Sequence, residues 1–140
     1  MTRIDFHSNI PDKITYACRL VRKARAAECK VVLLAADRNQ LAALDEALWT
    51  FSELDFLPHV TAENKLAGQT PVILSSDTTD LPHHQILINL SSRSPANFAR
   101  FERMFEIISP DEADVIAGRE RYRFYKERGY PLTHSVAEKA

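Results

Sequence analysis

The sequence predicts an α/β fold in three layers, a mostly parallel sheet with helices on both faces, Rossmann-like but without a phosphate-binding glycine loop. Apolar runs typical of buried strands alternate along the chain with segments of helical period. The 140 residues suit one ordinary domain, and 45% hydrophobic with 26% charged residues is a globular composition. Both observations favour a single hydrophobic core over a disordered or disulfide-stapled chain.

The first half of the chain contains two strand–helix units. Alternation over Thr2 to His7 predicts an opening strand, and apolar residues at helical spacing over 14–24 predict an amphipathic helix. The run 30–36 is apolar without alternation, which is typical of a central strand covered on both faces. Asp37 followed by Gln40 resembles a capping box and predicts the start of a second helix.

The second half contains shorter apolar runs. Residues 71–74 and 85–90 read as strands, and the polar gaps before them, 61–70 and 75–84, as surface loops. A short helix is expected over 97–101, and 104–108 is expected to be the last strand.

The final helix has clear start and stop signals. Ser109 is the expected cap, Pro110 the first helical residue and Glu112 the third, while Gly129 provides a stop. The domain is therefore expected to span 1–130, which leaves 131–140 as a C-terminal tail without a packing pattern, partly disordered.

Charge and cysteine content restrict the class of protein. The 18 basic and 19 acidic residues give a net charge of −1, which argues against a protein that coats nucleic acid through global charge. Cys18 and Cys29 form no disulfide framework, no leader precedes the first strand, and no apolar run is long enough to span a bilayer. A cytoplasmic protein without a membrane segment is expected.

Residues suited to catalysis or cofactor binding are few. Glycine occurs only at 68, 118 and 129, so neither a dinucleotide-binding nor a P-loop motif can be written, and no cofactor is expected. The histidines have no zinc spacing, Cys18 lies on the apolar stripe of its helix, and neither a metal site nor a catalytic residue is assigned. Four side chains lie near predicted strand ends: Asp5, His7, Asp37 and Asp77. In an enzyme some of them would be general acid or base groups or magnesium ligands. The favoured interpretation is that Asp37 caps a helix and that the others are turn residues.

The final helix carries a local basic cluster that favours binding. Five cations fall within ten residues: Arg119, Arg121, Arg123, Lys126 and Arg128. Spacings of three and four place an aromatic ring among cations on one side, formed by Arg119, Tyr122, Arg123 and Lys126. Such a side can hold an apolar side chain and a terminal carboxylate together. A solvated basic helix with snorkelling tyrosines is the open alternative.

The stretch Trp49 to Pro58 is unusually apolar for a connection. Its large side chains either fold back onto the core, which pattern alone favours, or remain exposed to anchor a partner.

At these residues the chain resembles the chi subunit of bacterial DNA polymerase III, the clamp-loader accessory protein, along essentially its whole length. The resemblance rests on the order and spacing of five pieces: 44–49 (LDEALW), 56–59 (FLPH), 71–73 (PVI), 86–88 (ILI) and 119–122 (RERY) with Tyr125 and Gly129.

The resemblance implies a non-catalytic adaptor in DNA replication. The nucleotidyltransferase activity would belong to the holoenzyme of which the chain is a subunit. Chi proteins have an α/β fold related to mononucleotide-binding domains, pair with the psi subunit of the clamp loader, and grip the acidic C-terminal tail of single-stranded DNA-binding protein. A repair helicase is a further partner associated with the psi-binding surface. DNA would be contacted only indirectly, in the cytoplasmic, nucleoid-associated replisome. The alternative is a small nucleotide- or nucleic-acid-binding α/β domain.

The resemblance also implies site residues. Arg119 and Tyr122 match the positions expected to hold the carboxylate and phenylalanine of the tail, with Arg123 near its acidic residues. Trp49 and Phe56, with Pro58 beside them, match the psi-facing surface. Where the family can carry a lysine one turn before the arginine this chain has a valine, at 115, so Arg121 or Lys126 would supply that charge.

Overall fold

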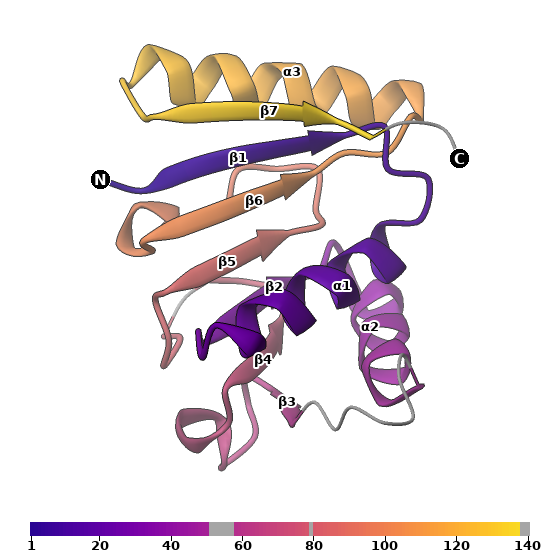
Figure 1. Ribbon diagram of the computed structural model, residues 1–140, viewed down its shortest axis with the longest axis vertical. Coiled ribbons are helices and arrows are strands. Elements are labelled where there is room, and N and C mark those ends of the chain that lie inside the picture. Colours follow the sequence, from indigo (N-terminus) through magenta and orange to yellow (C-terminus); the bar gives the residue numbers. More distant parts are fainter. Residues whose placement is uncertain (51–57, 79, 138–140) are drawn as a thin grey trace.

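The computed structural model describes residues 1–50, 58–78 and 80–137. Within them, seven strands pair in parallel to form one sheet. The strands are β1 (Arg3–Ser8), β2 (Val31–Leu34), β3 (His59–Thr61), β4 (Val72–Ser75), β5 (Ile86–Asn89), β6 (Arg103–Ile107) and β7 (Leu132–Val136). Their order across the sheet is β3-β4-β2-β5-β6-β1-β7 (Figure 1).

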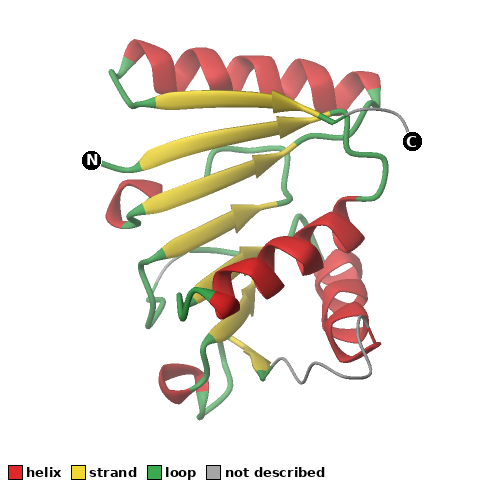
Figure 2. Cartoon of the chain, viewed as in Figure 1, coloured by secondary structure: helices red, strands yellow, loops and turns green. Residues whose placement is uncertain are grey.

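Three helices within the described residues cover the sheet: α1 (Lys13–Ala26), α2 (Arg38–Thr50) and α3 (Glu112–Glu127) (Figure 2). Successive residues of β2 point to opposite faces of the sheet and so belong to two different core clusters. Val31 and Leu33 pack in one core cluster with α1 and α2, whereas Val32 and Leu34 belong to a second cluster that includes α3. The three-layer α/β prediction is confirmed, and β2 is buried on both faces as its unalternating sequence predicts.

The helix boundaries follow from local hydrogen bonding. The Asp37 carboxylate accepts a hydrogen bond from the Gln40 backbone N–H at 2.8 Å, which confirms the predicted cap of α2. Gly129 has φ of +79°, and the Tyr130 N–H bonds to the Tyr125 carbonyl at 3.2 Å, so α3 ends in a Schellman motif at the predicted glycine.

The start of α3 differs from the prediction. The helix begins at Glu112 with Asp111 as its cap residue, rather than at Pro110 after Ser109. The Asp114 carboxylate explains the shift, because it accepts a hydrogen bond from the Ser109 N–H at 2.7 Å and pairs with Lys13 of α1 at 2.7 Å. Asp114 therefore fixes the residues before the helix, and Asp111 has an extended backbone in place of a helical one.

The C-terminal segment is more ordered than the sequence predicts. Residues 132–136, expected to belong to a tail without packing pattern, form β7 and pair in parallel with β1. Thr133 of β7 donates a hydrogen bond to the Asp5 carboxylate, and the Ala137 N–H bonds to the Ser8 carbonyl at 3.0 Å. The strand 103–107 is consequently not the last one, and β1 lies between β6 and β7.

Two smaller elements also differ. The gap 61–70 is not wholly a loop, because β3 occupies its first residue and a 3-10 turn occupies Ala67–Gln69. The expected helix at 97–101 is a single 3-10 turn, Phe98–Arg100. In the described part of the chain, no helix is long and apolar enough to cross a lipid bilayer.

Candidate functional site

A pocket of about 660 Å³ lies between α3 and the neighbouring ends of β1, β6 and β7. All four residues that the sequence analysis groups on one side of the last helix line it: Arg119, Tyr122, Arg123 and Lys126. The rest of the lining is Phe6, Ser8, Asn9, Ile108, Pro110, Val115, Gly118 and His134. The spacing of three and four along α3 is what brings the four residues together.

The floor of the pocket is apolar and aromatic. The Tyr122 ring packs edge-on against Phe6 of β1, with ring centroids 5.0 Å apart and planes at 67°. Phe6 is buried, whereas Tyr122 is only partly buried and belongs to the same apolar cluster through its ring. The floor therefore offers an aromatic surface against which an apolar ligand group can be buried.

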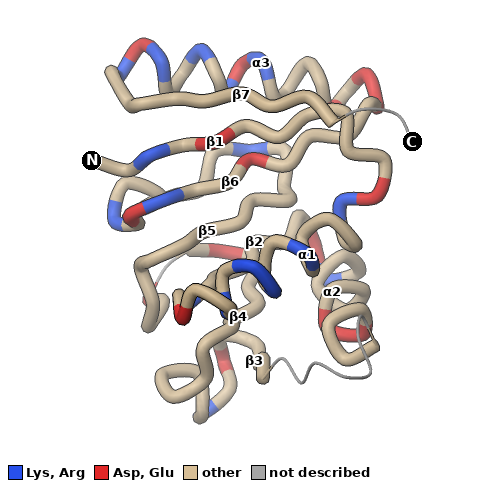
Figure 3. The backbone as a smooth tube through the Cα atoms, viewed as in Figure 1, with Lys and Arg blue, Asp and Glu red and all other residues tan. Residues whose placement is uncertain are grey.

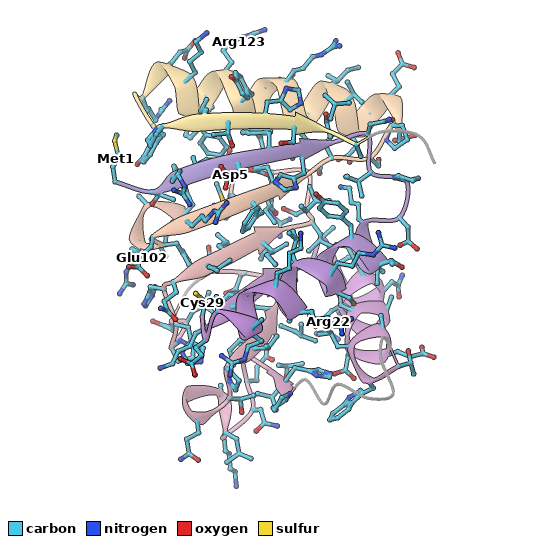
Figure 4. The ribbon with its side chains drawn as sticks, in the orientation of Figure 1. Met1, Asp5, Arg22, Cys29, Glu102 and Arg123 are labelled. Carbon is cyan, nitrogen blue, oxygen red and sulfur yellow. The ribbon has the colours of Figure 1, made fainter. Side chains whose placement is uncertain are left out.

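The rim of the pocket is positive. Arg119, Arg123 and Lys126 are exposed, and no acidic side chain of the described residues lines the pocket. Figure 4 shows Arg123 projecting from α3 away from the sheet. A guanidinium on such a rim can form bidentate hydrogen bonds with a carboxylate.

Gly118 brings α3 close to the end of the sheet. A Cβ atom at this position would lie 2.4 Å from Cδ1 of Ile108 and 3.1 Å from its Cγ1. Because Gly118 and Ile108 both line the pocket, the absence of a side chain on the helix helps to set the depth of the pocket.

Arg121 does not contribute to the positive rim, contrary to the expectation that it could replace the missing lysine. Its side chain is only 4% exposed and turns toward the sheet, where Nε donates to Oε2 of Glu106 at 3.2 Å. Tyr125 donates to the same oxygen at 2.6 Å, and Asn89 to Oε1 at 2.8 Å. Burial raises the pKa of Glu106, against the opposing effects of these neighbours. Arg121 thus anchors α3, whereas Lys126 does line the pocket.

The pocket residues contributed by strands are the ones that the sequence did not reveal. Phe6 lies in the predicted opening strand, where alternation gives no sign of a pocket, and His134 lies on β7, which was not predicted. His134 Nε2 lies 2.7 Å from the Ser8 hydroxyl, which ties β7 to β1 at the pocket wall.

The second predicted surface lies at the end of α2. The sequence pattern alone favoured a core position for Trp49. This prediction is wrong, because the Trp49 side chain is 51% exposed. Its ring lies against His59, with centroids 4.4 Å apart, and His59 is buried with Nε2 3.3 Å from Oδ1 of Asp45. Pro58 is half-buried before β3, and Phe56 lies outside the described residues.

The side chains predicted near strand ends have separate structural roles. Asp37 caps α2, as expected. Asp5 is not a turn residue, because it lies within β1, 2.6 Å from the Arg103 guanidinium. His7 also lies in β1, where its ring hydrogen-bonds the Tyr16 hydroxyl. Asp77 follows β4, and its backbone N–H donates to the Ser75 hydroxyl at 3.2 Å.

Cys18 is a core residue, as predicted. It is 1% exposed, and burial raises the pKa of its thiol to about 11. Since the thiolate is the nucleophilic form of cysteine, this environment keeps the side chain unreactive. Within the described ranges, no three His, Cys, Asp or Glu side chains are grouped so as to hold a metal ion.

The fold and the pocket together describe a small α/β protein with a cationic recess beside its last helix, and the floor of this recess is aromatic. Comparison with known proteins identifies the family to which this chain belongs. The family model described as DNA polymerase III chi subunit, HolC, matches residues 1–133, so the chain belongs to the family of DNA polymerase III chi subunits, which are accessory replication subunits.

Relatives named DNA polymerase III subunit chi agree with this assignment. The protein of Pseudomonas aeruginosa is 37% identical over an alignment of 137 positions, which covers 94% of this chain and 94% of the relative. The protein of Escherichia coli is 28% identical over 82% of this chain and 79% of its own length. The protein of Haemophilus influenzae is 26% identical over 84% of this chain and 82% of its own.

Proposed function

We propose that this chain is a non-catalytic adaptor of the DNA polymerase III holoenzyme. It links the clamp loader, through the psi subunit, to the acidic C-terminal tail of single-stranded DNA-binding protein. The observation that carries the proposal is the convergence of Arg119, Tyr122, Arg123 and Lys126 on one pocket with an apolar floor.

The pocket suits a short peptide with a terminal phenylalanine. The phenylalanine ring would be buried against Tyr122 and Phe6, which pack edge-on at 5.0 Å, and its carboxylate would pair with Arg119 at the rim. The acidic residues before it would meet Arg123 and Lys126, which are exposed. Charge and shape therefore agree with a tail that is acidic and ends in an aromatic residue.

The contact is expected to be weak and exchangeable. Burial of one phenylalanine contributes about 1.5–3 kcal/mol, and a charge-assisted hydrogen bond about 1.5–3 kcal/mol. Together these two terms give about 3–6 kcal/mol, and each exposed rim charge adds about 0.2–1 kcal/mol, so the expected affinity is at most about micromolar, near 8 kcal/mol. Such an affinity suits a replisome that repeatedly displaces the proteins coating its template.

Calorimetric titration tests the proposal. A peptide ending in Asp-Asp-Asp-Ile-Pro-Phe should bind, and the same peptide without its phenylalanine should not. Arg119→Ala should weaken binding at least about tenfold, the effect of losing one charge-assisted contact. The matched control is Arg128→Ala, which removes an exposed arginine of the same region that does not line the pocket. No binding of the full peptide by the folded chain would contradict the proposal.

The exposed Trp49 supports a second part of the proposal, the psi-facing surface. A half-exposed tryptophan held against a buried histidine is a rigid anchor of the kind that dominates protein interfaces. Trp49→Ala should reduce psi capture while tail-peptide binding stays unchanged, since Trp49 does not line the pocket. The repair helicase is proposed to share this surface, so that psi and helicase compete in a pull-down. Simultaneous binding of both partners would exclude the shared surface.

A further inference from the structure

β7 is an outer strand of the sheet, and one of its residues, His134, lines the pocket beside α3, here called the α3 pocket. Among the described strands, β7 pairs only with β1, on one side. The outer strand at the opposite end of the sheet, β3, has three residues, whereas β7 has five. Of the two edges that the described sheet offers to a further strand, β7 is therefore the longer.

The hydrogen bonds to β1 fix which backbone groups of β7 face outward. At the two ends of the pairing, the Ile4 N–H donates to the Pro131 carbonyl and the Ala137 N–H to the Ser8 carbonyl, both at 3.0 Å. Successive residues of a strand turn their N–H and C=O to opposite sides, so the odd-numbered residues from 131 to 137 face β1. The even-numbered residues turn theirs to the outer side of the strand, away from β1. These residues are Leu132, His134 and Val136.

The outer side of β7 is accessible and carries no charge. Four of its five residues are exposed, and Val136 is 62% exposed. Natural edge strands are commonly protected from further pairing by a lysine, by an internal proline or by short length. The sequence of β7, LTHSV, contains neither a charged residue nor a proline. Figure 3 shows β7 as an uncharged strand beside the charged helix α3. The edge is therefore suited to backbone pairing.

His134 joins this edge to the α3 pocket. Its side chain lines the pocket, where Nε2 lies 2.7 Å from the Ser8 hydroxyl, and its backbone N–H and C=O belong to the outward-facing set. Its ring also lies near Tyr122 on the pocket floor, with ring centroids 6.4 Å apart. The pocket and the outer side of β7 therefore meet at one residue, so a peptide held in the pocket can continue along the strand.

The cations of the pocket give such a peptide a direction. They follow one another along α3 in the order Arg119, Arg123 and Lys126, and the chain then reverses at Gly129 and returns as β7. α3 and β7 are consequently antiparallel neighbours, with Lys126 toward the start of β7 and Arg119 toward its end (Figure 1). A peptide with its terminal carboxylate at Arg119 and its acidic residues at Arg123 and Lys126 runs in the same direction as β7.

We propose that the acidic peptide adds to β7 as a further parallel strand while its terminal residue occupies the α3 pocket. This inference rests on the adaptor proposal, which supplies the position of the terminal carboxylate. The peptide backbone pairs with the outward N–H and C=O groups of β7, and every second side chain points toward the cations of α3. Backbone pairing of this kind supplies affinity, and the pocket supplies specificity. A proline next to the terminal phenylalanine has no N–H, so the pairing ends before it.

Calorimetry of the full chain with N-methylated peptides tests the strand addition. Each peptide ends in Asp-Asp-Asp-Ile-Pro-Phe and carries one methyl group, on the backbone nitrogen of an aspartate or of the isoleucine. Because a strand turns every second N–H toward its neighbour, methylation at alternate positions should weaken binding about three- to tenfold, the loss of one hydrogen bond. Methylation at the positions between them should change the affinity by less than about twofold. Equal effects at adjacent positions, or no effect at any position, would overturn the proposal.

His134→Pro and His134→Ala form a matched pair of variants on the protein. Both remove the imidazole, but only proline removes the outward N–H, and an edge strand tolerates proline where the N–H faces away from the sheet. The peptide should therefore bind about three- to tenfold more weakly to His134→Pro than to His134→Ala. Thermal unfolding checks that both variants are folded, and equal affinities of the two folded variants would overturn the proposal. The methylated peptides test the same pairing on the parent chain.

The direction and the occupant of the added strand are tested separately. A nitroxide on the first residue of the peptide should broaden the NMR methyl signals of Leu132 more than those of Val136, and the reverse would overturn the parallel arrangement. A concentration-dependent dimer of the chain alone, absent in His134→Pro, would assign the edge to a second copy and overturn the proposal. Failure of the unmodified peptide to bind would contradict the adaptor proposal as well, whereas binding without the alternating pattern would exclude only the strand addition.

Discussion

Arg121 and Glu106 form an ion pair in the interior, with Arg121 Nη2 3.2 Å from Glu106 Oε1 and side-chain exposures of 4% and 0%. The pair joins α3 to β6 beneath the helix. With Arg121 turned inward, Arg119 and Tyr122 of the same helix face the pocket. The buried pair therefore sets the rotation of the helix about its own axis.

Glu106→Gln should destabilise the fold by about 3–5 kcal/mol, because it leaves the Arg121 charge buried without a counter-ion. The glutamine keeps the shape of the side chain, so lost packing does not explain the effect. The double variant Glu106→Gln/Arg121→Met should recover much of the loss. Urea unfolding of the three proteins measures this, and a double variant no more stable than the single one would show that the charge is not the cause.

Gly118→Ala should destabilise the chain even though alanine favours helices. The gain in helix propensity is about 1 kcal/mol, but the new Cβ would lie 2.4 Å from Ile108 Cδ1 in a buried contact, and overpacking costs about 1–3 kcal/mol. Ile108→Val removes that Cδ1 atom, so adding it to Gly118→Ala should restore part of the stability. Thermal unfolding of both single variants and the double variant completes the cycle. Strict additivity would contradict a contact between the two positions.

Stability should fall as the pH drops below about 4, the ordinary pKa of an aspartate. Burial opposes ionisation of Asp5, but hydrogen bonds from Thr133 and Arg103 outweigh it and lower its pKa. Burial likewise opposes ionisation of Asp114, and Lys13 and the Ser109 N–H lower its pKa. Because both pKa values are lower in the folded chain than in the unfolded one, their stabilisation is present above the unfolded value and lost as the pH falls through the folded one.

Urea midpoints measured across the acid range at constant ionic strength test this dependence. Thr133→Val removes the hydroxyl that donates to Asp5, so it should move the acid loss of stability to higher pH. Asp5→Asn should flatten the slope, since one titrating carboxyl is gone. An unchanged slope in Asp5→Asn would remove Asp5 from the explanation.

Val115→Lys should strengthen binding of the acidic tail peptide by up to about fivefold at low salt, because one added rim charge is worth about 0.2–1 kcal/mol. Val115 lines the pocket, so the new ammonium would join Arg119 at the rim. The control is Ile116→Lys, which adds the same charge at an exposed position of α3 outside the pocket. Calorimetry at two salt concentrations distinguishes them, and equal gains would indicate a non-specific effect of charge.

The fold could be predicted where one period dominates the sequence. β2 is apolar without alternation because both of its faces are covered, and α1 shows its buried stripe at helical spacing. β7 escaped prediction because an edge strand with mostly exposed residues has no apolar pattern to detect. Its place beside β1 depends on pairings across the whole chain, which local pattern does not contain.

The side chains on α3 illustrate the same limit within the site. Spacing alone brought Arg119, Tyr122 and Arg123 to one side of the helix, and all three line the pocket. Spacing could not show that Arg121 is buried, because its partner Glu106 lies on a strand 15 residues earlier. A charged residue on a buried helix face is recognisable only once its partner is known.

β1 has consequences for the order in which the chain can fold during synthesis. It is the first strand to be made, yet both of its neighbours, β6 and β7, come from the C-terminal half. Asp5 must wait for Thr133, 128 residues later, before its hydrogen bond can form. Until His134 has left the ribosome, the pocket wall at Ser8 and His134 cannot be assembled. The α3 pocket is therefore completed only after nearly all of the described residues have been made, so a shorter nascent chain cannot present the whole pocket to a partner.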